Sequence, residues 1–558
     1  MRLFITSPSG IAEYVSANLR PRVGTRVGSG GIFCPGYVII AGINYGNDLS
    51  DEEDKNMSAK LWPKQEAEKI VQRFPDAKKY LLQTGFGPSG HPHMGTVGEV
   101  VRTHFVAMAL QDMGKKTVIQ VFSDDMDGLR KIPVNIDAPW LEEHLGKPVS
   151  AIPDPYGCCK SFSDHMNKEL VEMLDATGIP YKFVSAAAEY KKGTYNDVLQ
   201  LCMRRIDKVL GIILPTLREE NRQGWFPIMP VCEQCGKVNT TKVLNHDAET
   251  ATVEYSCSEE LKGAVGCGHH GSQFVGDGRS KFGWKADWGA RWAVFGINYE
   301  MYGKDLIESA KLSKQIARVL GGRPPVDMFY EMFLDETGKK ISKSVGQGLS
   351  VENWTRWGTH EALNYLMFKN PRQQKKLSQD TVVQYMDEVL KMDTDSPEYP
   401  YIYFAGSKPK LPIVYSDLIN IVSAVGVTEI RVLKEFILDI YGDELNAQWD
   451  RVEGLLELAI NFYSDFILPE RHFPTLSADQ NALVDKFLAL IAEQTEAEAI
   501  QTGTYTIAKE AGVPPREFFK LLYQIILGKP SGPRIGSFVS QLGADRVSEI
   551  IARNRKNA

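Results

Sequence analysis

The stretch TGFGPSGHPHMGTVGEV, at residues 84–100, decides the fold because it connects a predicted strand to a predicted helix. The strand-like run KKYLLQTGFG at 78–87 leads into it, and a helical pattern continues from it to a glycine at 114. A second apolar run, TVIQVF at 117–122, follows. Strand, glycine-rich loop, helix and strand form a βαβ unit and predict a parallel sheet in an α/β domain. Ligands of such sheets bind at the carboxyl ends of the strands, where this loop begins.

The glycines of the loop, Gly87, Gly90 and Gly95, allow tight turns and let a ligand approach the backbone. A helix that begins near Thr96 presents unpaired N–H groups and the positive end of its dipole, which suits a phosphate. His93, just before that helix, can donate a hydrogen bond to a phosphate oxygen whose charge grows in a transition state. The alternative is a surface turn in which the histidine only caps the helix.

The polar run KKISKSVGQG at 339–348 also predicts phosphate chemistry. Lys340 and Lys343 can neutralise a polyphosphate, and the flanking glycines let such a loop close over it. A charge run of this kind is more often a solvated face, so the run does not decide the function alone.

Three carboxylates, Asp124, Asp125 and Asp127, follow the second predicted strand. They lie at the same carboxyl edge and could hold a Mg²⁺ ion of the kind that polyphosphate chemistry requires. They could equally pair with the neighbouring Arg130 and Lys131, and the sequence leaves both interpretations open.

The composition is that of a globular protein with several domains. The chain has 558 residues, of which 43% are hydrophobic and 24% charged. It contains no run of about 18 apolar residues, so we expect no membrane span. Eight cysteines are too few for a disulfide scaffold and favour a reducing cytoplasm. The net charge of −6 gives no global attraction for nucleic acid, so any RNA contact has to be local.

The first 56 residues differ from the rest, with arginines, a glycine patch and the acidic run DLSDEED. They lack the compact apolar segment of a secretory signal. We expect residues 1–56 to be an N-terminal extension. It could be an organellar transit peptide, but we favour a start placed upstream of a true initiator at Met57.

The rest of the chain divides into a sheet-forming region, an insertion and a helical region. Residues 57–137 and 280–352 form two halves of one nucleotide-binding fold, and 138–279 reads as an insertion between them. Apolar positions at helical spacing, as in ALVDKFLALIAEQ, predict an α-helical domain at 353–558.

The two phosphate-directed runs resemble the signature pair of class I aminoacyl-tRNA synthetases. HMGT at 93–96 matches the motif written HIGH, and KISKS at 340–344 matches the motif written KMSKS. YGKD at 302–305 is similar to the element that touches the ATP ribose in this class. The resemblance implies that His93, Lys340 and Lys343 are catalytic. It also implies that ATP is bound by Pro88, Ser89, Gly90, His93, Gly95, Thr96, Gly303, Asp305, Lys340, Ser342, Lys343 and Ser344.

Longer stretches resemble class I lysyl-tRNA synthetase, the form found in many archaea and some bacteria. They include FSDDMDGLRKIP, WKADWGARWAVFG and KEAGVPPREFFKLLYQIILGKPSGPRIGSFVSQLG, so the resemblance spans nearly everything beyond the extension. It implies a ligase that uses ATP to attach L-lysine to tRNA(Lys) through a lysyl-adenylate, releasing AMP and diphosphate. It also implies a Rossmann-like catalytic domain and a C-terminal anticodon-binding domain. The sequence departs from the family at His91, where a leucine or similar residue is frequent, and at Val345 and Gln347.

A pocket for lysine has to pair an ε-ammonium and hold a four-carbon stem, which requires a carboxylate and aromatic walls. The alternatives for single residues are a solvent-facing Glu99 and a Trp284 that belongs to the core. A relative specific for glutamate would instead need an arginine. The resemblance places the lysine pocket at Gly85, Gly87, Glu99, Trp284, Asp287 and Tyr330.

Cys232 and Cys235 form a CxxC pair, and Cys257 and Cys267 follow within the expected insertion. Four thiolates, or three thiolates and an imidazole, suit a structural zinc ion that holds a subdomain together. The second pair is widely spaced, so Cys267 and His269 compete for the fourth position. The alternative is unbound buried thiols. We expect the other cysteines to be ordinary: Cys34, Cys158, Cys159 and Cys202.

The resemblance implies that the C-terminal helices bind the tRNA anticodon, and an excess of lysines and arginines over acids in the last 50 or so residues supports RNA binding there. The alternative is the charged surface of a helical bundle. Three other functions compete: a class I synthetase of another specificity such as glutamyl, an adenylate-forming paralogue without tRNA charging, and a non-catalytic zinc RNA-binding module. We expect a cytoplasmic monomer. Possible stacking partners for anticodon bases are Phe518, Phe519, Tyr523 and Arg534.

Overall fold

Five parallel strands form the main sheet in the part of the chain that the computed structural model describes, residues 61–335, 338–339 and 351–557. Leu82 in the central strand pairs with a residue of each neighbouring strand, Ile119 and Tyr299. The predicted parallel sheet is confirmed. In sheet order the strands are β12 (Val326–Tyr330), β11 (Tyr299–Gly303), β1 (Tyr80–Phe86), β2 (Thr117–Ser123) and β3 (Lys182–Ser185).

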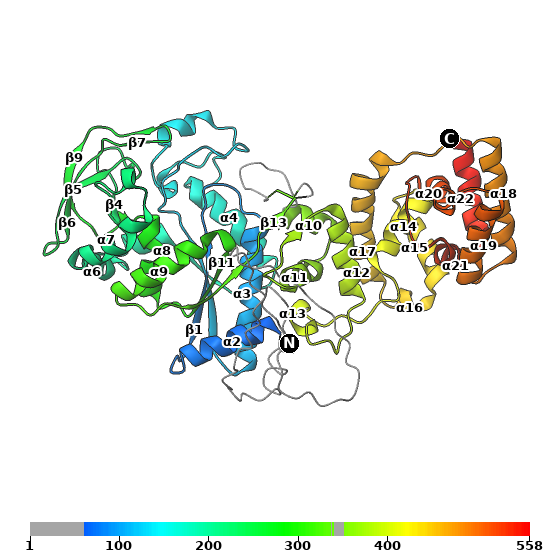
Figure 1. Cartoon of the computed structure of the whole chain (residues 1–558), viewed down its shortest axis with the longest axis horizontal. Helices are drawn as coiled ribbons and strands as arrows, with labels where there is room; N and C mark the ends of the chain where they lie inside the picture. The colour runs from blue at the N-terminus through cyan, green and yellow to red at the C-terminus, as the bar shows by residue number, and fades with distance from the viewer. Residues whose placement is uncertain (1–60, 336–337, 340–350, 558) are drawn as a thin grey trace, which may run out of the picture. The chain divides into compact units, whose positions relative to one another are not determined.

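Side chains of the central strands alternate between hydrophobic clusters on the two faces of the sheet. In β1, Leu82 packs with one set of helices and Leu81 packs on the opposite side. In β2, Val121 packs on the same side as Leu82, and Phe122 packs on the opposite side. Helices therefore cover both faces of the sheet, in keeping with the Rossmann-like domain that the resemblance implied (Figure 1). The helices are α2 (Trp62–Arg73), α3 (Met94–Asp112) and α4 (Phe162–Asp175) on the first face, and α8 (Trp284–Phe295) and α9 (Ile307–Val319) on the second.

The range 138–279, which we expected to be an insertion, also supplies the main sheet with its edge strand β3. β3 has four residues, of which one is buried, so its pattern is too short to be recognised from the sequence. After β3 the range forms helices and small antiparallel ladders. These elements are α5 (Ala186–Lys191), α6 (Asn196–Arg204), α7 (Ile206–Ile213), β4 (Ile228–Pro230), β5 (Lys242–Asp247), β6 (Thr252–Ser256), β7 (Glu260–Leu261), β8 (Ala264–Val265) and β9 (His270–Phe274), with β4 paired to β10 (Ser280–Phe282).

The described residues after 350 are almost entirely helical, as predicted. The two-residue strand β14 (Lys375–Lys376) is an exception, and it pairs with β13 (Phe333–Leu334). The longer helices are α10 (Val351–Trp357), α11 (His360–Phe368), α12 (Gln379–Leu390), α14 (Tyr415–Val425), α15 (Ile430–Tyr441), α17 (Trp449–Phe462), α18 (Ala478–Glu493), α19 (Ala497–Glu510), α20 (Pro515–Leu527), α21 (Ile535–Leu542) and α22 (Ala544–Asn557).

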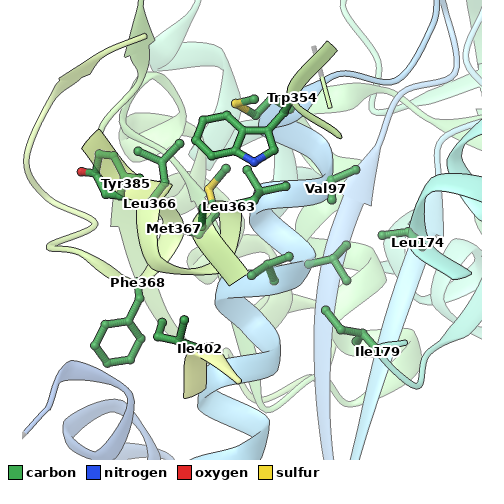
Figure 2. Packing of buried hydrophobic residues seen from close by; sticks show 14 of the residues in the cluster. Val97, Leu174, Ile179, Trp354, Leu363, Leu366, Met367, Phe368, Tyr385 and Ile402 are labelled. Carbon is green, nitrogen blue, oxygen red and sulfur yellow. The ribbon is translucent and has the colours of Figure 1, made fainter. Parts of the chain in front are cut away.

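The first of these helices share the core of the sheet region. Figure 2 shows Leu363, Leu366 and Met367 of α11 beside Val97 of α3, in one buried cluster. The two helices approach so closely that a Cβ atom on Gly98 would lie 2.6 Å from the Met367 sulfur. The helices around α11 therefore fold together with the sheet region, whereas α18 to α22 surround another cluster, to which α14 and α15 also contribute.

Residues 1–60, which include the predicted extension and Met57, lie outside the described residues. Within the described ranges, none of the helices combines the length and the apolar character needed to cross a membrane.

Candidate active site and metal centres

The predicted site residues meet at the carboxyl edge of the main sheet. β1 ends in the loop 87–93, which we call the phosphate loop, β2 ends before Asp124, and β11 ends at Gly303. β1 lies between β2 and β11, so the edge contains the kind of switch point at which open α/β sheets bind ligands. A cavity of about 330 Å³ opens there, lined by Gly87, Pro88, Ser89, Asp124, Asp127, Gly128, Arg130, Lys131, Val149, Lys262 and Trp284.

His93 caps the N-terminus of α3, since its Nδ1 accepts a hydrogen bond of 3.3 Å from the Thr96 N–H. The capping role that we considered as an alternative is therefore present. It also fixes the imidazole at the positive end of the helix dipole. A Cβ atom on Gly95 would lie 2.8 Å from the His93 ring, so a side chain there would displace the imidazole. A Cβ atom on Gly90 would lie 3.7 Å from the Pro133 side chain, which is an ordinary contact distance.

Gly303 and Asp305 lie together at the end of β11. A Cβ atom on Gly303 would lie 2.8 Å from Asp305 Oδ1, so the glycine lets this carboxylate come close to the strand. The KISKS run lies outside the described residues, with Lys340, Ser342, Lys343 and Ser344.

Glu99 links three elements at the predicted lysine pocket. Its Oε1 accepts a hydrogen bond from the Gly85 N–H at 3.0 Å, and its Oε2 accepts one from the Tyr330 hydroxyl at 2.5 Å. Burial and the nearby Glu99 carboxylate raise the pKa of Tyr330 well above its usual value, so the hydroxyl stays protonated. The Arg102 guanidinium lies 4.7 Å from the Tyr330 ring centroid. The structure therefore brings together three of the residues in the predicted pocket.

The other half of the predicted pocket contains Trp284 and Asp287, at the start of α8. The Trp284 side chain is 37% exposed and lines the cavity with Gly87, so it does not belong to the core. Asp287 is buried, accepts a hydrogen bond of 2.8 Å from the Tyr190 hydroxyl, and pairs with Arg291 at 2.6 Å. Asp287 is thus not among the residues that line the cavity.

The carboxylates after β2 are bonded to partners that we did not predict. Asp124 pairs with Arg291, and Asp127 pairs with Lys281. Burial raises the pKa of Asp124 to about 7, against the opposing attraction of Arg291. These two pairs and Asp287 form a network of three carboxylates and two cations, which we call the carboxylate network.

Asp125 is separate from this network. It accepts hydrogen bonds from the Ser185 hydroxyl and from the Ala187 N–H, at 2.5 and 2.7 Å. It therefore anchors β3 and α5. Because each of the three aspartates already has a protein donor, the trio does not resemble a preformed magnesium site.

The four predicted zinc ligands converge, and we call them the four-cysteine cluster. Cys232 and Cys267 have their sulfurs 3.7 Å apart, as do Cys235 and Cys257. A tetrahedron with zinc–sulfur bonds of about 2.3 Å would separate its sulfurs by about 3.8 Å, so the thiols fit a zinc ion. His269 instead contacts Glu233 at 2.9 Å, which favours Cys267 as the fourth ligand.

A second group of metal-ligating side chains was missed by the sequence reasoning, which treated Cys158 and Cys159 as ordinary. Their sulfurs lie 3.6 Å apart, and the Cys158 sulfur is 3.2 Å from His165 Nδ1. Asp154 Oδ1 lies 3.4 Å from the same nitrogen. One ligand atom from each of these four residues lies within 4.8 Å of the others. This mixed-ligand cluster, as we call it, has a donor set of one carboxylate, two thiols and one imidazole, which suits zinc.

The chain is similar to known proteins over most of its length. A family model described as tRNA synthetases class I (K) matches residues 60–401. The lysine–tRNA ligase of Rickettsia bellii (strain OSU 85-389) is 35% identical over 530 residues, covering 90% of this chain and 99% of that protein. The lysine–tRNA ligase of Rickettsia akari is 36% identical over 529 residues, covering 90% of this chain and 98% of that protein. The likeness to a solved glutamate tRNA ligase from Elizabethkingia meningosepticum is weak, with 12% identity and a TM-score of 0.34 over 86% of this chain and 99% of that one.

Proposed function

Because this chain belongs to the class I lysyl-tRNA synthetases, we propose that the carboxyl edge of its sheet is where lysine is activated. The enzyme is a ligase that attaches L-lysine to tRNA(Lys) in two steps. The lysine carboxylate attacks the α-phosphorus of ATP, which gives lysyl-adenylate and diphosphate. A hydroxyl of the terminal tRNA ribose then attacks the activated carbonyl and releases AMP. Neither step requires a protein nucleophile, since positioning and charge stabilisation supply the catalysis.

The phosphate loop is our proposed site for the ATP phosphates. His93 is held at the N-terminus of α3 through its Nδ1, where the helix dipole and the ring attract the same anion. Pro88 and Ser89 line the adjoining cavity, and Gly303 and Asp305 are proposed to hold the ribose. Lys340 and Lys343, with Ser342 and Ser344, are proposed to meet the phosphates from the KISKS run. Mg²⁺ would neutralise the phosphate oxygens, and we propose that it binds with ATP because the three aspartates after β2 are already bonded within the protein.

The single observation that carries lysine specificity is the Glu99 carboxylate, which the Gly85 N–H and the Tyr330 hydroxyl hold at the end of β1. The carboxylate network has three carboxylates and two cations, and Glu99 adds a fourth carboxylate at the neighbouring strand end. An ammonium bound at Glu99 would form a charge-assisted hydrogen bond with this carboxylate. Arg291 could have suggested a glutamate pocket, but Asp124 and Asp287 already pair with it. We propose that Glu99 accepts the ε-ammonium of lysine and that Trp284 and Tyr330 line the stem.

Zinc is proposed at both metal clusters as a structural ion. In the four-cysteine cluster it would tie β4 to the ladder of β6 and β9, within the part of 138–279 that we propose contacts the tRNA acceptor stem. The four thiols leave no open ligand position for water, so neither step of the reaction is assigned to this metal.

The C-terminal helices are proposed to bind the anticodon. Arg534, Arg546 and Arg555 pair with acidic residues of the same region, which limits their attraction for RNA. Phe518 is buried in the core of these helices and is not a stacking partner. The exposed cations of α19 and α20 are better candidates: Lys509, Arg516 and Lys520. We also propose a monomer that works in the cytoplasm, where free thiols persist.

The test of the proposed function is ATP–diphosphate exchange on the purified full chain, with lysine, glutamate and arginine offered in turn, with and without tRNA. Exchange with lysine alone, followed by charging of tRNA(Lys), is the expected result. Exchange with glutamate would assign the glutamyl specificity. Lysine-dependent exchange without charging would assign the adenylate-forming paralogue, and no exchange even with tRNA present would contradict an adenylating enzyme.

A further inference from the structure

His91, one of the positions at which this sequence departs from its family, links the phosphate loop to the mixed-ligand cluster. Its Nδ1 lies 2.7 Å from Glu169 Oε2, and its Nε2 lies 3.0 Å from the Tyr156 hydroxyl. Tyr156 belongs to the turn between Asp154 and Cys158, and Glu169 belongs to α4, on which His165 also lies. A leucine at this position could make neither hydrogen bond.

Glu169 joins this histidine to the cluster itself. Its Oε1 lies 3.2 Å from His165 Nε2, one turn earlier on α4, while His165 Nδ1 faces Cys158 and Asp154. A histidine that binds a metal through one ring nitrogen usually donates its other N–H to a carboxylate. His165 has this arrangement, with Nδ1 directed at the cluster and Nε2 directed at Glu169.

One assignment of protons satisfies the whole chain of contacts. An ionised Glu169 accepts from His165 Nε2–H with one oxygen and from His91 Nδ1–H with the other. The Nε2 of His91 then accepts the Tyr156 hydroxyl hydrogen. Glu169, His165, His91 and Tyr156 all keep their charge and tautomer when a metal binds at His165 Nδ1, so these contacts are compatible with an occupied cluster.

The metal cluster also fixes the turn that carries Tyr156. Asp154, whose side chain is 1% exposed, accepts the N–H groups of Tyr156, Cys158 and Cys159 at 2.7 to 3.0 Å. The Tyr156 ring stacks on His165, with ring centroids 4.2 Å apart. A metal held by the cluster would therefore hold both residues that contact His91, Tyr156 through Asp154 and the stacked His165 ring, and Glu169 through His165.

We infer that the mixed-ligand cluster, with a zinc ion bound, positions the phosphate loop for ATP through Glu169 and His91. This inference rests on the proposed function, because it takes the phosphate loop as the ATP site. His91 and Glu169 are positioning residues, since they act through the loop and not on the reacting atoms. The consequence is that ATP binding depends on a metal centre that has no role in the chemistry.

The test measures ATP affinity by equilibrium dialysis of labelled ATP, with no lysine present. The variants are His91→Ala, Glu169→Ala and their double mutant in the full chain, with zinc counted per chain. Glu172→Ala is the matched control, because Glu172 is exposed on the same helix and pairs only loosely with Lys168, at 3.9 Å. Thermal unfolding and the lysine KM in the exchange assay are measured alongside.

Each single variant is expected to raise the ATP Kd about tenfold, the usual size of an effect at the second layer of a metal site. The double mutant should bind ATP no more weakly than the single variant with the higher ATP Kd, because both changes act through one contact. His91→Ala should keep two zinc ions per chain, and the melting temperature and the lysine KM should match those of Glu172→Ala. A stability defect alone would move the melting temperature and leave the ratio of ATP to lysine affinity unchanged.

Two results would overturn the inference. One is a wild-type chain that holds a single zinc ion, and the other is an ATP Kd within twofold of wild type in both single variants. Failure of the proposed function is a different result, namely a wild-type chain that binds ATP but shows no exchange with lysine. In that case the ATP Kd values of the variants still decide the inference. A wild-type chain that does not bind ATP would contradict both.

Discussion

Replacing Glu99 with glutamine tests the proposed lysine pocket most directly. The change removes one negative charge and keeps the shape of the side chain. The remaining amide oxygen can still accept the Gly85 N–H, which now lies 3.0 Å from Oε1, so the strand end and α3 stay connected. Tyr330 keeps its stacking on Arg102. The variant is therefore expected to fold like the wild type and to differ in the charge that faces the substrate.

The size of the effect follows from the bond that is lost. A hydrogen bond between an ammonium and a carboxylate contributes about 1.5–3 kcal/mol more than no bond at all. Since about 1.4 kcal/mol corresponds to a factor of ten, the lysine KM should rise about 10- to 150-fold. The ATP KM should change by less than a factor of about two, because the phosphate loop and its cap do not involve Glu99.

The assay is ATP–diphosphate exchange at saturating ATP with lysine varied, and then the reverse. Glu308→Gln is the control, since Glu308 carries the same charge on α9 and is 83% exposed beside Lys311. An unchanged lysine KM in Glu99→Gln would refute the assignment and would place the ε-ammonium at the carboxylate network instead. A parallel rise in both KM values would show that Glu99 serves the site only as a structural link.

Three further changes test other parts of the structure. Gly95→Ala should lower the exchange rate by about 10- to 100-fold and leave the lysine KM unchanged, because the new Cβ atom would lie 2.8 Å from the His93 ring and displace it. Exchange rates measured with lysine varied and then with ATP varied check this prediction. Cys267→Ser should remove one zinc ion per chain and His269→Ala none, as counted by elemental analysis; the opposite result would make the histidine the fourth ligand. His104 is buried and its pKa is lowered by burial from 6.5 to about 4, so its contribution to stability is present above pH 6.5 and is lost as the pH falls towards 4. Urea unfolding should show up to about 3 kcal/mol of this loss in the wild type and not in His104→Phe; an equal loss in both would assign it to other groups.

The parts of the fold that could be predicted have local signals. The loop at 87–93 lies between a strand and a helix, both long enough for their apolar periods to be recognised, and the structure places all three where the sequence did. The CxxC pair at Cys232 predicted a thiol cluster because two ligands are adjacent in the sequence. Its fourth member was left open, since residues beyond a turn can reach the metal from several positions, and only the placed chain separates Cys267 from His269.

The partners of Asp124 and Asp127 could not be predicted, because the residues that pair with them are more than 150 positions away. Sequence reasoning offered the nearest cations, Arg130 and Lys131, yet the pairing depends on β10 and α8 returning to the end of β2. The mixed-ligand cluster was missed for a related reason. Its spacing resembles no common zinc pattern, and its ligands converge only because Asp154 folds the turn back onto α4.

The position of Arg291 in the carboxylate network has a consequence for specificity. A buried arginine in an amino-acid pocket normally selects an anionic substrate, but here Asp124 and Asp287 take up its charge and Lys281 takes up that of Asp127. The paired cations hold the network rigid without offering a site for an acid. Glu99 lies outside these pairs, and it is the carboxylate with which we propose that the ε-ammonium of a bound lysine pairs. Replacing the pairs with neutral residues would therefore remove rigidity first, and the preference for a cation would persist as long as Glu99 is present.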